Sequence, residues 1–297
     1  MGFAQPRIAG QSGRGYLLGS KDMRRDESCF IDRRAFCGAG LAIVACTAAG
    51  AQAPAPLPPE QFPLDTEEQR IADLVTANHI LADQGVLDSY GHVTARSLKN
   101  PKHFLMSRNR APGLVTAEDI MEFDENSLPV DQKGRQIYNE RFIHGEIFRA
   151  RPDVMAVVHS HAPDVLPFSV TDAPLKAMIH MAHFIGSDPV PVFDLETVEG
   201  PRNGMLVLNS RAGAALAQKL GNRNLVLMRG HGMTVVGPNV RRATYNAVYT
   251  QINARAEMEA LKLGKPKFMN EFEVQRVGQI NRAWEAWADH AKGARSS

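Results

Sequence analysis

A proline-rich segment divides the chain into two unlike parts. Residues 54–63 (PAPLPPEQFP) contain five prolines, which restrict the backbone and cannot continue a helix or a sheet, so an extended spacer is predicted there. Residues 64–297 follow without a further linker, internal repeat or block of like charge, and a segment of that length suits one large domain. The sequence therefore predicts a separate N-terminal segment at 1–53, a linker at 54–63 and a single folded domain at 64–297.

The first 53 residues have the organisation of an export signal. A basic region precedes the 19 uncharged residues of Ala35–Ala53, which are rich in Ala and Gly, and this order is typical of a secretory signal. Arg33-Arg34 resembles a twin-arginine export motif, and Ala49-Gly50-Ala51 fits the small-residue cleavage pattern. We therefore expect export to the periplasm by a twin-arginine-type signal.

Other interpretations of this leader remain open. The uncharged run could be a retained anchor, but Ala, Gly, Cys and Thr make it weakly hydrophobic, so no stable membrane span is expected in the mature chain. Ile43–Cys46 resembles a lipoprotein cleavage box, and a cytoplasmic protein with an unstructured tail is a further alternative. Met23 is an alternative start that would leave a basic region of conventional length.

Setting the leader aside changes the composition from which function is inferred. Seven of the 34 basic residues and four of the 32 acidic residues precede residue 54, so the remainder has a formal net charge of −1. That balance gives no electrostatic footprint for nucleic acid. All three cysteines lie in the leader and all ten histidines lie in the domain. The domain therefore uses neither disulfides nor thiolates, and any metal site in it must be built from His, Asp and Glu.

Hydrophobic periodicity in the domain predicts strands mixed with helices. Thr66-Glu67-Glu68-Gln69 forms a capping box, with Leu64 as its hydrophobic staple, before a helix that ends at Gly85. Further helices are predicted at 134–151, 241–263 and 271–290. Strands are predicted at 91–97, 103–107, 120–123, 155–162, 206–208, 225–228 and 233–236, the last two as a hairpin. Strands in hairpin-like pairs among helices predict a layered α/β fold with an at least partly antiparallel sheet.

Three histidines form a candidate metal-ligand set. His159 and His161 are two apart on a predicted apolar strand, so their side chains project to the same face. A pair of solvated or hydrogen-bonded histidines is the alternative explanation. His231 lies between two glycines after another apolar run, and glycines allow a tight turn that exposes the imidazole. Three histidines with an open coordination position are typical of catalytic zinc, although Mn²⁺, Co²⁺ or Fe²⁺ also fit such ligands.

Glu140 is a candidate general base beside these histidines. Glu140 and His144 are four apart on the predicted helix 134–151, so they would share a face. The short connection Arg151-Pro152-Asp153 keeps that helix close to the strand with two histidines. A positioned carboxylate there could transfer protons during catalysis. A solvated carboxylate paired with Arg141 or Arg135 is the alternative.

These motifs resemble the class II aldolase/adducin family, which includes fuculose phosphate aldolase and ribulose phosphate epimerase. The resemblance runs from about residue 66 to 264 and is carried by Glu140–His144, Arg151–Asp153, Val157–His161 and His231-Gly232. It implies three layers, α/β/α, with a central, largely antiparallel sheet, and a homo-oligomer that is usually a four-fold tetramer. It also implies a divalent metal, with Zn²⁺ the first choice, on His159, His161 and His231 and an acid/base role for Glu140. Adducin-like members lack these ligands, so their presence argues for an enzyme.

The chain departs from the pattern of the family's sugar-phosphate members. Where those members hold phosphate with Gly-Asn, Thr-Gly or Ser-Gly, and Ser-Ser, this chain has Gly91-His92, Ser107–Arg110 and Tyr138-Asn139. The family's tyrosine after a histidine is replaced by Met181 after His180. The resemblance therefore points to a small substrate without phosphate.

Four residues are candidates for contact with that substrate. Arg108 and Arg110 could form a fork for a carboxylate, and solvated loop arginines are the alternative. His92 and His180 could also contact the substrate.

The leading functional hypothesis is a metal-dependent carbon–carbon lyase of the retro-aldol type, acting on a hydroxy-carbonyl compound. The metal would chelate adjacent oxygens as a Lewis acid and stabilise an enediolate, while Glu140 moves the proton. Decarboxylation passes through the same kind of intermediate. The alternatives are therefore a decarboxylase of a hydroxylated aromatic carboxylic acid and a non-catalytic adducin-like module.

Overall fold

The computed structural model describes residues 65–275 and 278–294. The predicted leader at 1–53, the linker at 54–63 and the proposed staple residue Leu64 lie outside the described residues. The predictions made for them stay predictions.

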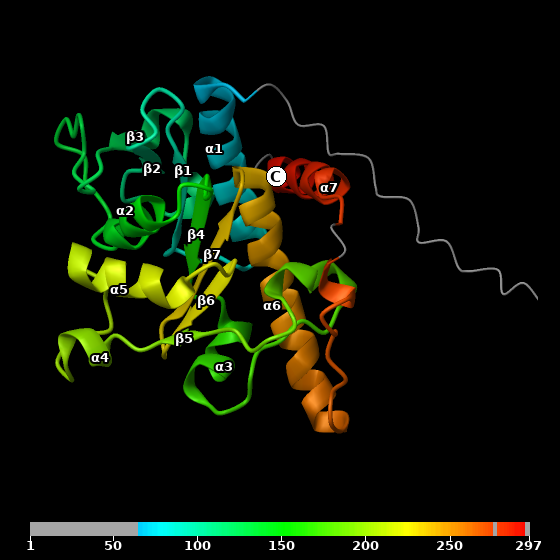
Figure 1. Ribbon diagram of the computed structural model, residues 1–297. Coiled ribbons are helices and arrows are strands. Elements are labelled where there is room, and N and C mark those ends of the chain that lie inside the picture. The colour runs from blue at the N-terminus through cyan, green and yellow to red at the C-terminus, as the bar shows by residue number, and fades with distance from the viewer. Residues whose placement is uncertain (1–64, 276–277, 295–297) are drawn as a thin grey trace, which may run out of the picture. The chain divides into compact units, whose positions relative to one another are not determined.

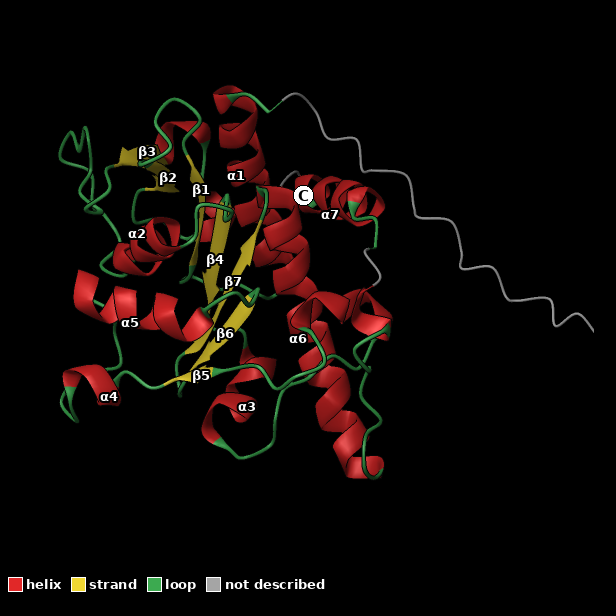
Figure 2. Cartoon of the chain, viewed as in Figure 1, coloured by secondary structure: helices red, strands yellow, loops and turns green. Residues whose placement is uncertain are grey.

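Helices are distributed along the whole of the described chain (Figures 1 and 2). The α-helices are α1 (Glu67–Asp83), α2 (Arg141–Ala150), α3 (Leu166–Val170), α4 (Glu196–Glu199), α5 (Ser210–Leu220), α6 (Val240–Leu263) and α7 (Asn281–Gly293). Short 3-10 turns lie at η1 (Pro112–Leu114), η2 (Ala117–Asp119), η3 (Pro163–Val165), η4 (His180–Ile185) and η5 (Glu273–Gln275). Among these described helices, none is both long enough and apolar enough to cross a membrane.

Within the described residues, seven strands form one mixed sheet in the order β3-β2-β1-β4-β7-β6-β5. The strands are β1 (His92–Arg96), β2 (Phe104–Ser107), β3 (Ile120–Phe123), β4 (Ala156–Ser160), β5 (Val192–Phe193), β6 (Leu225–Met228) and β7 (Gly232–Gly237). Each neighbouring pair is antiparallel except β5 with β6, which is parallel. The predicted hairpin is β6–β7, and β4 lies at the centre of the sheet with β1 on one side and β7 on the other.

Helices cover both faces of the sheet, as three layers require. Successive residues of β4 belong to different cores. Val158 packs into the core that includes residues of α1, α6 and α7, and Val157 packs into the core that includes residues of α2 and α5. Figure 1 shows α2 and α5 on one side of the strands and α1, α6 and α7 on the other. The alternation of strand side chains therefore divides the apolar residues between two layers. The predicted three-layer α/β/α fold with a largely antiparallel sheet is confirmed.

Three predicted elements differ from the structure. Helix 134–151 begins only at Arg141, because the residues before it form a loop whose Gln136 carbonyl accepts a hydrogen bond from Asn109 N–H. The predicted strand 206–208 is irregular backbone. The predicted helix 271–290 is replaced by η5 and, further along, by α7. By contrast, α1 begins where predicted, since the Thr66 side chain accepts a hydrogen bond from Gln69 N–H at 3.1 Å.

The contact between α2 and α5 allows no side chain at Gly213. A Cβ atom there would lie 2.5 Å from the Phe142 carbonyl oxygen and 2.9 Å from Glu146 Cγ. We expect Gly213→Ala to push α5 away from α2 and to lower the free energy of unfolding by about 1–3 kcal/mol, the usual cost of overpacking. Urea unfolding measures this change. The control is Gly293→Ala on α7, where no heavy atom lies within 4 Å of the added Cβ; equal unfolding midpoints for the two variants would contradict the packing argument.

Glu257 is a buried carboxylate on α6. Its side chain is 0% exposed, and its Oε2 accepts a hydrogen bond from Lys176 N–H at 3.2 Å. Burial raises the pKa of Glu257 to about 7, and the contact with Lys176 offsets only part of that effect. Asn253, one turn earlier, holds the same segment by accepting a hydrogen bond from Met178 N–H.

The raised pKa of Glu257 predicts a pH-dependent stability. Between its unfolded pKa near 4.5 and its folded pKa near 7, the folded state binds the additional proton, so stability falls as pH rises through that window. We expect Glu257→Gln to flatten the dependence between pH 5 and pH 8, measured as the free energy of unfolding in urea. Glu259→Gln, at an exposed position on the same helix, is the control and should keep the wild-type slope. A wild-type slope in Glu257→Gln would show that another group titrates.

Candidate metal centre

Three elements bring the predicted ligands to one place. His159 lies on β4 and His161 follows directly after its end, while His231 lies in the turn between β6 and β7. Because β4 pairs with β7 so that Ser160 is opposite Met233, the β6–β7 turn lies beside the end of β4. Glu140 is the residue immediately before α2.

The four side chains converge closely. One ligand atom from each of Glu140, His159, His161 and His231 lies within 4.8 Å of all the others. His161 Nε2 and His231 Nε2 are 3.1 Å apart, and Glu140 Oε2 lies 3.6 Å from His159 Nε2 and 3.5 Å from His231 Nε2. Three imidazole nitrogens and a carboxylate oxygen around one point form a ligand set suited to a borderline divalent ion.

Backbone carbonyls orient two of the imidazoles. His159 Nδ1 lies 3.1 Å from the Met233 carbonyl oxygen and His231 Nδ1 lies 2.5 Å from the Met205 carbonyl oxygen. A carbonyl only accepts, so each ring donates through Nδ1–H, and Nε2 is the nitrogen left for a metal ion. His159 Nε2 is buried and without a hydrogen-bond partner among the described residues. A buried acceptor left unpaired is costly, and a metal ion bound at this nitrogen would satisfy it.

Gly232 permits the close approach on which this cluster depends. A Cβ atom at this position would lie 2.0 Å from the Ser160 carbonyl oxygen and 3.0 Å from His161 Cα. Any other residue would force the β6–β7 turn away from the end of β4. The glycine after His231 is therefore needed for the contact of β4 with β7, and not only for the turn.

Glu140 is held by the loop that precedes α5. Its Oε1 accepts a hydrogen bond from Val207 N–H at 3.0 Å, which leaves Oε2 directed at His159 and His231. Burial raises the pKa of Glu140, but the two imidazoles lower it more, so the pKa lies well below its ordinary value. The carboxylate is therefore ionised at neutral pH, the form in which it can accept a proton or bind a cation.

Most of the surrounding histidines are neutral. Burial is the main cause that lowers the pKa of His92, His144 and His159, and burial followed by the charges of His159 and His231 lowers the pKa of His161 to about 4. His231 is the exception: burial lowers its pKa, but the contact with Glu140 outweighs burial and raises it. Neutral imidazole is the form that binds metals.

His144 does not share the cluster with Glu140, contrary to the prediction from their spacing. His144 Nε2 lies 2.7 Å from His92 Nδ1, and His144 Nδ1 lies 2.7 Å from Thr94 Oγ1. The reason is that Glu140 precedes the helix, so the i and i+4 geometry of a continuous helix does not apply to it. His144 instead supports His92, whose ring centroid lies 5.2 Å from that of His159 and 4.6 Å from that of Tyr138.

The other predicted substrate residues lie at different distances from the cluster. Arg108 and Arg110 meet at a buried carboxylate, with Arg108 Nε 2.6 Å from Asp119 Oδ1 and Arg110 Nη1 3.0 Å from Asp119 Oδ2. Tyr138 links Arg110 to His92, because its hydroxyl donates to the Arg110 carbonyl while its ring packs on His92. His180 lies on η4 and lines a cavity whose lining includes none of the four cluster residues. The structure thus brings His92 to the cluster, connects the Arg110 backbone to His92 through Tyr138, and leaves His180 apart.

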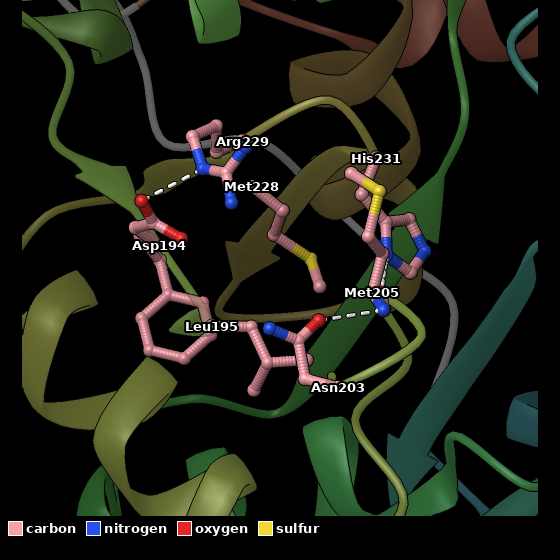
Figure 3. Close-up of a pocket in the computed structure, with 8 residues that line it drawn as sticks. Asp194, Leu195, Asn203, Met205, Met228, Arg229 and His231 are labelled. Atoms are coloured by element: carbon pink, nitrogen blue, oxygen red, sulfur yellow. Dashed lines mark hydrogen bonds and ion pairs between the residues drawn. The ribbon is translucent and has the colours of Figure 1, made fainter. Parts of the chain in front are cut away.

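Reasoning from the sequence missed the contribution of residues 203–207. Met205 and Val207 contact His231 and Glu140 through backbone atoms, which no side-chain pattern reveals. Figure 3 shows Asn203, Met205 and His231 lining a small pocket together with Asp194 and Arg229, which form an ion pair. The available signal was the Asn203-Gly204 dipeptide, which marks a turn rather than the predicted strand.

Comparisons with known proteins agree with this architecture. The model of the Class II Aldolase and Adducin N-terminal domain matches residues 72–258. Decarboxylase tropJ of Talaromyces stipitatus is 34% identical over 245 residues, which cover 73% of this chain and 92% of that protein. The 3,4-dihydroxyphthalate decarboxylase of Arthrobacter keyseri is 29% identical over 64% of this chain and 78% of its own length.

A solved structure shows the same fold. The L-fuculose 1-phosphate aldolase from Glaciozyma antarctica superimposes with a TM-score of 0.64 at 23% identity, over 80% of this chain and 95% of that one. At that identity the similarity is evidence of fold alone, whereas the family model spans more than half of this chain. The chain belongs to the class II aldolase/adducin family.

Proposed function

We propose that this protein is a metal-dependent decarboxylase of a hydroxylated aromatic carboxylic acid. The observation that carries the proposal is the convergence of Glu140, His159, His161 and His231 in a chain that is 34% identical to a decarboxylase over most of both sequences. A second similar protein is a decarboxylase named for a dihydroxy aromatic acid. These relatives favour decarboxylation over the retro-aldol cleavage that was the leading hypothesis from the sequence.

The divalent ion would be held by three imidazoles, those of His159, His161 and His231. The Nε2 atoms of His161 and His231 face the cluster, and Nε2 of His159 has no hydrogen-bond partner among the described residues. Zn²⁺ suits three imidazoles, and Mn²⁺, Co²⁺ or Fe²⁺ are compatible with the same donors. When bound, such an ion supplies a Lewis acid for adjacent carboxylate and hydroxyl oxygens of a substrate.

Glu140 would transfer the proton that decarboxylation requires. Ionised Glu140 accepts the proton of the substrate's hydroxyl group adjacent to the carboxylate. The bond between the ring carbon and the carboxylate then breaks, carbon dioxide leaves, and the electron pair stays on the ring carbon. Glu140 returns the proton to that carbon, which leaves the hydroxyl oxygen as a phenolate, and a proton taken up from solvent completes the replacement of the carboxylate by hydrogen. The hydrogen bond from Val207 N–H holds Glu140 Oε1 in place and leaves Glu140 Oε2 for this proton transfer.

His92, Arg108 and Arg110 are the proposed substrate contacts. His92 lies beside His159 and is held by His144, so its position is suited to a hydrogen bond with a ring hydroxyl group. Arg108 and Arg110 together carry one more positive charge than Asp119 neutralises, and both side chains are about one-third exposed. That excess charge suits a second carboxylate of the substrate.

Metal binding is the first test of the proposal. We expect purified protein to contain about one divalent ion per chain, as three imidazole ligands imply. Elemental analysis should show that His159→Ala loses the ion, because a buried ligand is removed. The control is His290→Ala, which removes an exposed histidine that pairs with Asp83. This variant should keep the metal ion. A wild-type protein that binds no divalent metal would refute both the decarboxylase and the aldolase, and would leave the adducin-like module.

Product analysis separates the two reactions. With a panel of dihydroxylated benzoates and phthalates and of hydroxy-carbonyl compounds, we expect carbon dioxide release from the aromatic acids and no aldehyde from the others. Glu140→Gln should lower kcat by about 10²- to 10⁴-fold, the usual range for loss of a positioned acid/base group. Aldehyde release without carbon dioxide would favour the aldolase instead. Full turnover by Glu140→Gln would exclude Glu140 as the proton-transfer group.

A further inference from the structure

One loop contacts two members of the metal centre through its backbone. The Met205 carbonyl accepts a hydrogen bond from His231 Nδ1–H, and two residues later Val207 N–H donates to Glu140 Oε1. His231 and Glu140 come from different elements that are far apart in the sequence. The loop 200–209, which we call the strap, is therefore positioned to set the orientation of both groups together.

The strap is fixed at its C-terminal end. Val207 is 0% exposed and packs into the core that includes residues of α2 and α5. Asn209 caps α5, with its Oδ1 accepting a hydrogen bond from Ala212 N–H at 2.9 Å. These anchors hold Val207 in place, but they leave the direction of the Met205 carbonyl to the residues before it.

Met205 has a backbone conformation that a residue with a side chain rarely adopts. Its φ is 61°, in the left-handed region, where most residues other than glycine are disfavoured. Asn203 stabilises this turn from both sides: its Oδ1 accepts a hydrogen bond from Met205 N–H at 2.7 Å and its Nδ2 donates to the Gly200 carbonyl at 2.6 Å. Figure 3 shows the Asn203 amide directed at the Met205 backbone, with His231 on the other side of that residue.

The direction of the Met205 carbonyl decides the state of His231. Because a carbonyl can only accept, its contact at 2.5 Å keeps a proton on Nδ1, so Nε2, which lies near His161 and Glu140, is the nitrogen that a metal ion would bind. If Met205 left the left-handed region, this carbonyl would rotate away. His231 would then be free to change its ring orientation and to place its proton on Nε2. A protonated Nε2 has no lone pair with which to bind a metal ion.

We propose that Asn203 is a positioning residue for the metal centre, which acts by holding Met205 in the left-handed conformation that directs its carbonyl at His231 Nδ1. This inference rests on the proposed metal site. It does not depend on which reaction the site performs. The Asn203 side chain hydrogen-bonds the backbone of Gly200 and Met205, so we expect it to act on the metal centre through the backbone of the strap.

Metal affinity tests the role of Asn203. In the full-length protein, Zn²⁺ affinity is measured by competition with a chromogenic chelator, and the visible spectrum of the Co²⁺ form reports ligand geometry. We expect Asn203→Ala to weaken affinity at least about tenfold, the lower bound for loss of a group that orients a ligand, and to change the Co²⁺ spectrum. Asn203→Asp keeps an acceptor for Met205 N–H and should stay within about threefold of the wild type.

A matched control separates this role from turn formation in general. Asn100 makes the same kind of turn, with its Oδ1 accepting a hydrogen bond from Lys102 N–H at 3.2 Å, at the end of β1 away from the cluster. Asn100→Ala should leave both affinity and spectrum unchanged. The inference is overturned if Asn203→Ala binds Zn²⁺ like the wild type, or if Asn203→Asp loses as much affinity as Asn203→Ala.

A second pair of variants tests the backbone conformation directly and does not depend on Asn203→Ala folding. Met205→Val introduces a β-branched residue that strongly disfavours positive φ, whereas Met205→Asn introduces one that tolerates it. Both remove the same apolar side chain, which is partly exposed. We expect weaker Zn²⁺ binding in Met205→Val than in Met205→Asn, and equal affinities would overturn the inference. Absence of metal from the wild type would instead refute the proposed function, so the two failures are distinguishable.

Discussion

The antiparallel pairing of β4 with β7 is the constraint on which the candidate metal centre depends. Its register places His159 opposite Thr234 and Ser160 opposite Met233, so the turn that carries His231 must lie beside the end of β4. The same register supplies the Met233 carbonyl that orients His159. A slip of one residue would turn His159 to the other face of the sheet, and the ligand set would be lost. Gly232 makes this register possible, because no side chain fits against the Ser160 carbonyl.

The centre also concentrates polar groups in a place where they are costly. Glu140, His144, His92 and His159 are all buried, and a buried polar group without a partner destabilises the fold. The structure satisfies most of them in pairs: His144 with Thr94 and His92, and Glu140 with Val207 N–H. His159 Nε2 is left without such a pair. This unsatisfied nitrogen is a group that a bound cation would satisfy.

The sequence was sufficient to predict the structure where local rules, such as strand alternation and turn-forming residues, decide it. Alternation along β4 predicted that His159 and His161 share a face, and the glycines around His231 predicted a turn. The sequence was insufficient for prediction where a contact with a residue far away in the chain decides the local structure. Arg108 and Arg110 are held by Asp119, which their own sequence context did not indicate. The apolar run 206–208 resembled a strand, but the Val207 N–H that would join a sheet donates to Glu140 instead.

The three candidate ligands lie at the central strands, whereas residues beside them lie on loops. This difference bears on which molecules can bind next to the ligands. The three histidines lie on or directly beside β4 and β7 at the centre of the sheet, where packing on both faces restricts movement. Arg108 and Tyr138 lie on loops, which tolerate change more readily than the strands they connect. A change in these loops can therefore alter what binds beside the ligands without disturbing the ligands themselves. Tyr138 lies in such a loop before Glu140, and its aromatic ring packs on His92, whose ring lies beside that of His159.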